Sequence, residues 1–389
     1  MSLWHSNSVL ESSYPPQLFA DWVMLGNTRP LSVIRMNRRD FLAASALTAA
    51  GGLCDPLARA AEPKSPAFKG KAEACIFIWL GGGMGQIDTF DPKPEIEKHA
   101  GKRPASADLR TERVTGGLMP SPFKFRPGGR CGLPVSDLLP SVRECADDLC
   151  VLRAVHGDNP NHGPALLLMN NGTMTPRVPA MGAWCSYGLG TENANLPSFM
   201  VIAPALPYAG AQVWSADFLP GCHQGTRVVP GAEPVPNINR RVADSELQEM
   251  ELGLGAAFNQ KHLLARGNDP QLAARIKSFE TAFGMQAAAP EAFDLSKETD
   301  ATLNLYGLPR GSTKGFAWQC LIARRLAERG VRFIELIDTG ASGNWDSHGY
   351  MAAHGPLAKN VDQPMAALLK DLKSRDLLKD TLVVWATEF

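Results

Sequence analysis

The sequence lacks an excess of charge of either sign, and this argues against two classes of partner. Lysine and arginine together number 39, as do aspartate and glutamate, so the formal net charge is zero. Nucleic acids and anionic membranes attract proteins mainly through clusters of positive charge. The composition therefore predicts a soluble globular protein with no nucleic-acid partner and no stable membrane insertion.

Cysteine motifs and long apolar runs are also missing. The eight cysteines form no Cys-x-x-Cys pair and no zinc-finger pattern. Two interpretations of them remain: they are buried thiols, or they form one or two disulfides after export. The apolar stretch at residues 41–53 is too short and too rich in glycine to span a bilayer. No internal repeat is present.

The N-terminal region has the pattern of an export signal. Residues 37–42 read Asn-Arg-Arg-Asp-Phe-Leu, and Ala58-Arg59-Ala60 forms a small-x-small cleavage site. A short core helix with a basic start is the alternative. We expect residues 36–60 to be a twin-arginine signal peptide, and residues 1–35 to be a start-site artefact. The protein is then periplasmic or extracellular, and the twin-arginine export machinery is a partner.

The remaining residues, 61–389, alternate between apolar runs and amphipathic segments. This alternation predicts an α/β domain with a largely parallel central sheet. A charged helical segment at 245–283 is expected to be a surface insertion, and Arg324 and Arg325 are expected to face water. Strands are predicted at 74–80 (central), 149–154, 196–202, 331–337 and 382–386, and helices at 138–148, 163–170, 313–329 and 357–377.

The chain ends on a strand that carries an acid to the edge of the sheet. Residues 381–389 form an apolar, β-branched run that ends in Glu388-Phe389. Open α/β folds place their chemistry at the carboxyl ends of such strands. We expect the domain to be C-terminally truncated, with at least one further His or Asp ligand downstream. The chain as given is then expected to bind metal weakly.

Acids and histidines follow three of the predicted strands. Asp88 follows the first, Asp346 and His348 follow the strand at 331–337, and Glu388 follows the last. Carboxylates mixed with imidazoles suit a divalent metal ion such as Zn²⁺, Mn²⁺, Ca²⁺ or Mg²⁺. Asp88 has the alternative of a turn or capping residue. His354 is expected to be a surface group or to lie behind the ligands.

Several of these motifs together resemble a known exported family, the domain of unknown function 1501. The resemblance covers the chain from about residue 72 to its end. It rests on residues 81–94, Asn161-His162-Gly163 with Gly172, residues 345–348 and residues 382–389. That family is regarded as a distant branch of the alkaline phosphatase and sulfatase superfamily.

The resemblance implies a three-layer α/β sandwich with a metal centre, often of two ions. It implies that Asp88, Asp346 and His348 are metal ligands and that Glu388 replaces an Asp of the last motif. Phe389 stands where a metal-binding His is expected. His162 stands where the superfamily has a hydroxyl or thiol nucleophile, ten residues before a glycine.

Three functional hypotheses follow. The favoured one is an exported metal-dependent hydrolase of phosphate or sulfate esters, in which Asp88, Asp346, His348 and Glu388 hold the metal and His162 lies near the reacting group. Three roles are open for His162: a metal ligand, a general base or a loop residue. The second hypothesis is a non-catalytic exported protein that keeps the fold to bind an anionic glycan or a partner. The third is a fragment that is inactive because its last motif is missing.

Overall fold

The computed structural model describes residues 70–103, 116–153, 155–239 and 244–388. They belong to the second of two compact units, residues 70–389, and the predicted signal peptide lies outside the described residues. The core is a parallel five-stranded sheet in the order β5-β4-β6-β1-β7. Its strands are β1 (Ala74–Trp79), β4 (Phe199–Ile202), β5 (Thr226–Val228), β6 (Phe333–Ile337) and β7 (Thr381–Ala386).

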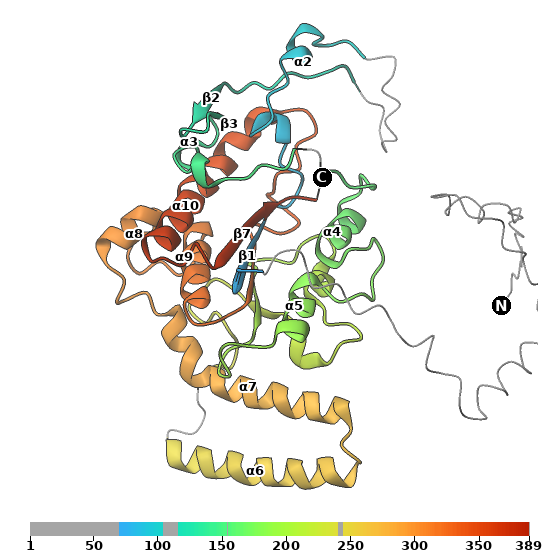
Figure 1. Cartoon of the computed structure of the whole chain (residues 1–389), viewed down its shortest axis with the longest axis vertical. Helices are drawn as coiled ribbons and strands as arrows, with labels where there is room; N and C mark the ends of the chain where they lie inside the picture. Colours follow the sequence, from blue (N-terminus) through green and yellow to red (C-terminus); the bar gives the residue numbers. More distant parts are fainter. Residues whose placement is uncertain (1–69, 104–115, 154, 240–243, 389) are drawn as a thin grey trace, which may run out of the picture. The chain divides into compact units, whose positions relative to one another are not determined.

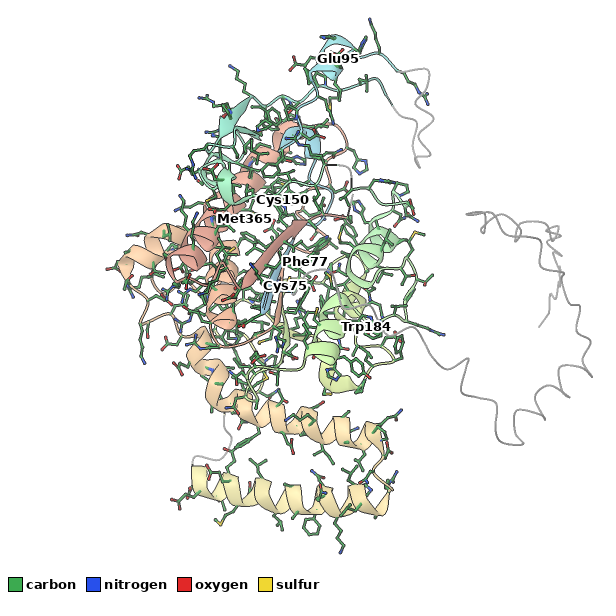
Figure 2. All side chains as sticks on the ribbon, in the orientation of Figure 1. Cys75, Phe77, Glu95, Cys150, Trp184 and Met365 are labelled. Atoms are coloured by element: carbon green, nitrogen blue, oxygen red, sulfur yellow. The ribbon has the colours of Figure 1, made fainter. Side chains whose placement is uncertain are left out.

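Helices cover both faces of this sheet (Figure 1). Alternate residues of β1 enter different cores: Ile76 and Ile78 pack toward α9 (Phe316–Ala327) and α10 (His354–Ser374). Phe77 packs toward α4 (His162–Asn171) and α5 (Met181–Leu189). Figure 2 shows Met365 of α10 and Trp184 of α5 on opposite sides of the strand that carries Cys75 and Phe77. The predicted α/β class and parallel sheet are confirmed.

The other elements surround this core. The antiparallel hairpin β2 (Phe125–Gly128) and β3 (Leu133–Ser136) forms a second, two-stranded sheet. The predicted helical segment is a pair of long helices, α6 (Ser245–Ala265) and α7 (Pro270–Phe293). The remaining helices are α2 (Pro94–Lys98), α3 (Pro140–Arg143), α8 (Asp300–Tyr306), η1 (Gln86–Asp88), η2 (Ala146–Asp148), η3 (Gly210–Trp214), η4 (Gly221–His223) and η5 (Met351–Ala353).

Three local predictions are wrong. The strand in the middle of the sheet is β6. The strand that was predicted to be central, β1, lies next to it, between β6 and β7. Residues 149–153 form no strand: Leu152 is 73% exposed, and the run has no strand beside it to pair with. The helix predicted at 138–148 is instead the short α3 and η2. The seven described cysteines are free thiols.

The prediction that Arg324 and Arg325 face water is also wrong. Both side chains are buried in an ion-pair network between α9 and its neighbours. Arg324 lies 2.9 Å from Glu298, 2.6 Å from Glu328 and 3.0 Å from Asp371. Burial by itself raises the pKa of Glu298, but the hydrogen bonds from the two arginines outweigh it and lower that pKa. A helical period distinguishes the two faces of α9 but does not reveal acids that arrive from other segments.

Removing the central arginine is therefore expected to be costly. The change Arg324→Met would remove the buried cation that Glu298 and Asp371 share and leave them with Arg325 and Arg375. Removing one partner from a buried ion-pair network costs about 3–5 kcal/mol of unfolding free energy. The matched control is Arg130→Met, because the Arg130 side chain is 97% exposed and pairs with Asp147 at the surface, where a pair is worth about 1 kcal/mol or less. Urea unfolding of both variants measures the difference. Equal, small losses would contradict a structural role for the network.

Candidate functional site

A glycine-rich loop directly after β1 brings the site together. Gly82 has a φ of +105°, a backbone conformation that favours glycine. A Cβ atom at this position would lie 2.4 Å from the backbone nitrogen of Asp346. The carbonyl of Gly81 also accepts a 2.9 Å hydrogen bond from the backbone of Trp345. The glycines thus allow the loop after β6 to lie directly against the loop after β1.

Glu388 is the buried anchor on the other side of this loop. Glu388 comes two residues after β7, whose pairing with β1 ends at the pair Trp79 and Ala386. Its Oε1 atom accepts a 2.7 Å hydrogen bond from the backbone N–H of Gly82. The same oxygen lies 2.9 Å from Nδ1 of His162. The acid that the sequence places at the end of the last strand is therefore held by two partners.

His162 is the first residue of α4, and its imidazole lies between two carboxylates. Its Nδ1 faces Glu388, and its Nε2 lies 3.3 Å from Oδ2 of Asp346. A neutral imidazole carries only one N–H and can donate to only one of these two oxygens. Satisfying both contacts requires a second proton or a cation shared with a carboxylate. This arrangement is typical of a site that binds positive charge.

Asp346 in turn lies between two imidazoles. Its Oδ1 atom is 2.7 Å from Nε2 of His348, while Oδ2 faces His162. The backbone N–H of Asp346 donates to the side chain of Asn344 at 3.0 Å, which fixes the turn. Glu388, His162, Asp346 and His348 therefore form one continuous chain of contacts. Of the four predicted ligands, which must converge to share a metal, Asp346, His348 and Glu388 lie in this chain together with His162, and Asp88 does not belong to it.

A buried residue, Trp345, holds the loop that carries Asp346 and His348. Its indole N–H donates to Asp338 at 3.3 Å, and its carbonyl accepts from Nε2 of His354 at 3.0 Å. Burial raises the pKa of Asp338 to about 6, and this indole hydrogen bond opposes the shift. His354 is 1% exposed, so its placement at the surface is wrong, and it lies behind the loop that carries Asp346 and His348. Among the described residues, its hydrogen bond and its ring contact connect it to this loop through Trp345.

Asp88 is the fifth candidate and is placed differently. It lies in η1 and is 1% exposed, and neither carboxylate oxygen has a hydrogen-bond partner among the described residues. A Cβ atom on Gly85 would lie 2.8 Å from its Oδ2 atom. A buried carboxylate is costly unless a proton, a hydrogen bond or a cation compensates it. Asp88 is therefore suited to hold a cation. Its burial without a hydrogen-bond partner among the described residues is a stronger reason for this role than its position after a strand.

The donors fit a divalent metal by their chemistry, although they contact one another in this structure. Imidazole nitrogens and carboxylate oxygens are ligands for Zn²⁺ and Mn²⁺. Within the described residues, no three His, Cys, Asp or Glu side chains are already spaced to surround one ion. The orphaned carboxylate of Asp88 and the two carboxylates around His162 are the observations that favour a cation here.

Sequence reasoning missed two polar neighbours of the site, Tyr208 and Asn344. Tyr208 stacks on the imidazole of His162 with a centroid distance of 4.3 Å and an interplanar angle of 13°. Its hydroxyl oxygen accepts a 3.0 Å hydrogen bond from the side chain of Asn344. Tyr208 follows β4, at the same carboxyl edge of the sheet as the other residues. The strand-end rule that selected the acids could have selected it too.

The described structure also has a hollow outside the candidate site. A cavity of about 580 Å³ lies elsewhere, lined by residues such as Phe123, Lys124, Ser141 and Lys359, and none of the site candidates contributes to it. Among the described residues, no helix has the length and apolar character needed to cross a membrane.

Comparison with known proteins identifies a family over most of the chain. The searches of curated proteins and of solved structures found no match. The matched family is described as "Protein of unknown function (DUF1501)", and its match spans residues 72–389. This range includes the glycine loop and all five candidate residues. The chain belongs to the DUF1501 family.

Proposed function

We propose that the protein is an exported metal-dependent hydrolase of phosphate or sulfate esters. The observation that carries this proposal is the contact chain Glu388–His162–Asp346–His348 at the carboxyl edge of a parallel sheet. Open α/β sheets bind their ligands at this edge. The resemblance to the alkaline phosphatase and sulfatase superfamily supplies the reaction class, and the twin-arginine pattern supplies the location.

Each site residue has a role in this proposal. Asp88, Asp346, His348 and Glu388 hold a divalent ion, which is Zn²⁺, Mn²⁺, Ca²⁺ or Mg²⁺. A bound divalent ion polarises an ester oxygen and lowers the cost of negative charge that develops on it. His162 holds a proton next to the reacting group, because Glu388 fixes its Nδ1 and leaves Nε2 directed toward Asp346.

Tyr208 completes the arrangement by orienting the histidine. Its ring covers one face of the His162 imidazole. Its hydroxyl is tied to Asn344, which also fixes the turn before Asp346. The ring therefore restricts rotation of His162 and shields one face from water.

A non-catalytic binding protein is the second candidate, and one observation favours it. His162 begins α4 at the position where the superfamily carries a hydroxyl or thiol nucleophile. Without such a nucleophile, the same cluster could hold a cation that binds an anionic glycan and catalyses nothing. The two candidates agree on the site and differ in turnover.

Turnover of aryl esters separates the two candidates. The protein is stripped of metal, reloaded with Zn²⁺ or Mn²⁺, and assayed with aryl phosphate and aryl sulfate esters. His162→Asn is expected to lower kcat/KM by about 10²-fold or more, since a positioned acid or base contributes about 10²–10⁴-fold. His99→Asn is the matched control, because His99 is exposed. Metal binding without turnover in the parent protein would favour the binding protein.

A further inference from the structure

Helix α6 exposes apolar side chains along its length and buries none of its described residues. Leu247 is 45% exposed, and the exposed fractions of Met250, Leu254 and Phe258 are 65%, 62% and 65%. These four positions follow a helical spacing of three and four residues, so they share one face. Figure 1 shows α6 running alongside α7. The side chain of Gln248 in α6 donates a 2.8 Å hydrogen bond to the side chain of Gln286 in α7.

Such a helix is poorly stabilised by what the described structure provides. Most helical stability in proteins comes from packing of an amphipathic face rather than from intrinsic propensity. Gly253 and Gly255 lie in the middle of α6, where each glycine costs about 1 kcal/mol relative to alanine. A Cβ atom at either glycine would meet no atom within 4 Å in this structure. Nothing in the described fold therefore requires glycine at these positions.

The charges of α6 are segregated and symmetric about its centre. Acidic residues occupy the N-terminal half, and basic residues occupy the C-terminal half and the C-cap. Glu251 and Lys261 are equally distant from Ala256, and so are Glu246 and Arg266. In an antiparallel pair of identical helices centred on Ala256, each glutamate would face the basic residue of the other copy. Leu254 and Phe258 would face each other in the same way.

We propose that α6 is a self-association surface, which pairs with α6 of a second copy in an antiparallel, two-fold arrangement. A two-fold interface must be complementary to itself, and the charge order of α6 meets this condition. A membrane surface fits less well, because helices that bind anionic lipid carry mainly Lys and Arg on their polar face.

Charge reversal tests the arrangement. In the full chain, Glu251→Lys places two lysines opposite each other at both ends of the pair, and Lys261→Glu places two glutamates there. Each single variant is expected to raise the dimer Kd by about tenfold or more. The double variant with both changes, and an equimolar mixture of the two single variants, should dimerise like the parent. Sedimentation velocity over a range of concentrations measures all of these Kd values.

An apolar variant with a matched control completes the test. Leu254→Ser is expected to weaken dimerisation, whereas Leu189→Ser should not, because Leu189 is 62% exposed but lies on α5. Circular dichroism checks that both variants keep the parent's helix content. A monomeric parent, or double and single variants that behave alike, would overturn the proposal. Sedimentation of the parent with phosphatidylcholine–phosphatidylglycerol vesicles, lost in Leu254→Ser, would overturn it in favour of a lipid surface.

Discussion

Replacing Asp346 by asparagine is expected to weaken binding of a divalent cation by more than 100-fold. The reason is its place in the contact chain, where one carboxylate faces both His162 and His348. Changes to groups behind the ligands typically cost 10–100-fold in metal affinity, so loss of a ligand should cost more. The amide of asparagine keeps the shape but removes the charge. Competition with a fluorescent chelator measures the Kd of Zn²⁺ and Mn²⁺.

A matched surface substitution controls for the loss of negative charge. Glu280→Gln removes one carboxylate from α7, where Glu280 pairs with Lys277 at the surface. Its Kd for the cation should equal that of the parent. His348→Gln should weaken binding in the same direction as Asp346→Asn. Equal affinities for the parent and Asp346→Asn would show that the cation binds elsewhere or not at all.

Replacing Glu335 by glutamine is expected to stabilise the protein by about 3–5 kcal/mol at pH 8 and to change little at pH 5. Glu335 lies in the middle strand of the sheet, with Phe77 and Val201 beside it on the neighbouring strands. It is 1% exposed, and its Oε1 atom has no hydrogen-bond partner among the described residues. Burial raises the pKa of Glu335 to about 8.

The sign of the effect follows from the two states of the carboxyl group. In the unfolded chain it ionises near its ordinary pKa of 4.5, whereas in the folded protein it stays protonated up to about pH 8. The folded state therefore binds more protons between these values, and the free energy of unfolding falls as the pH rises through this window. Glutamine does not ionise, so the free energy of unfolding of the variant does not fall with pH through this group.

Urea unfolding of both proteins at several pH values measures the difference. Other titrating groups are shared by the two proteins, so their contributions cancel in the comparison. Glu95→Gln on the surface helix α2 is the control and should track the parent at every pH. A gap between Glu335→Gln and the parent that stays constant from pH 5 to pH 8 would contradict the raised pKa.

Local patterns predicted most of the sheet and the helices around it. Apolar runs located β1, β4, β6 and β7, because buried parallel strands have apolar side chains on both faces. The run at 149–154 has the same local character, but no strand lies beside its described part. Strand order was not predictable, since it depends on contacts between residues far apart in the sequence. The position of β1 between β6 and β7 is such a case.

The candidate site was predictable where the rule of strand ends applies. It located Asp346, His348 and Glu388, and the structure places them in one contact chain with His162. The burial of Arg324 could not be predicted from helical periodicity, because Glu298 reaches it from the segment before α8 and Asp371 reaches it from α10. The orphaned carboxylate of Asp88 likewise depends on how its surroundings fold.

Anomalous X-ray scattering from crystals loaded with Zn²⁺ or Mn²⁺ shows directly whether Asp346 and its neighbours bind a metal ion. A peak is expected beside the Asp346 carboxylate, within coordination distance of His348 and of Asp88 or Glu388. The peak should disappear in the Asp346→Asn variant. A fully occupied peak at another place in the protein, or the absence of any peak at saturating metal, would contradict the assignment of these residues as a metal site.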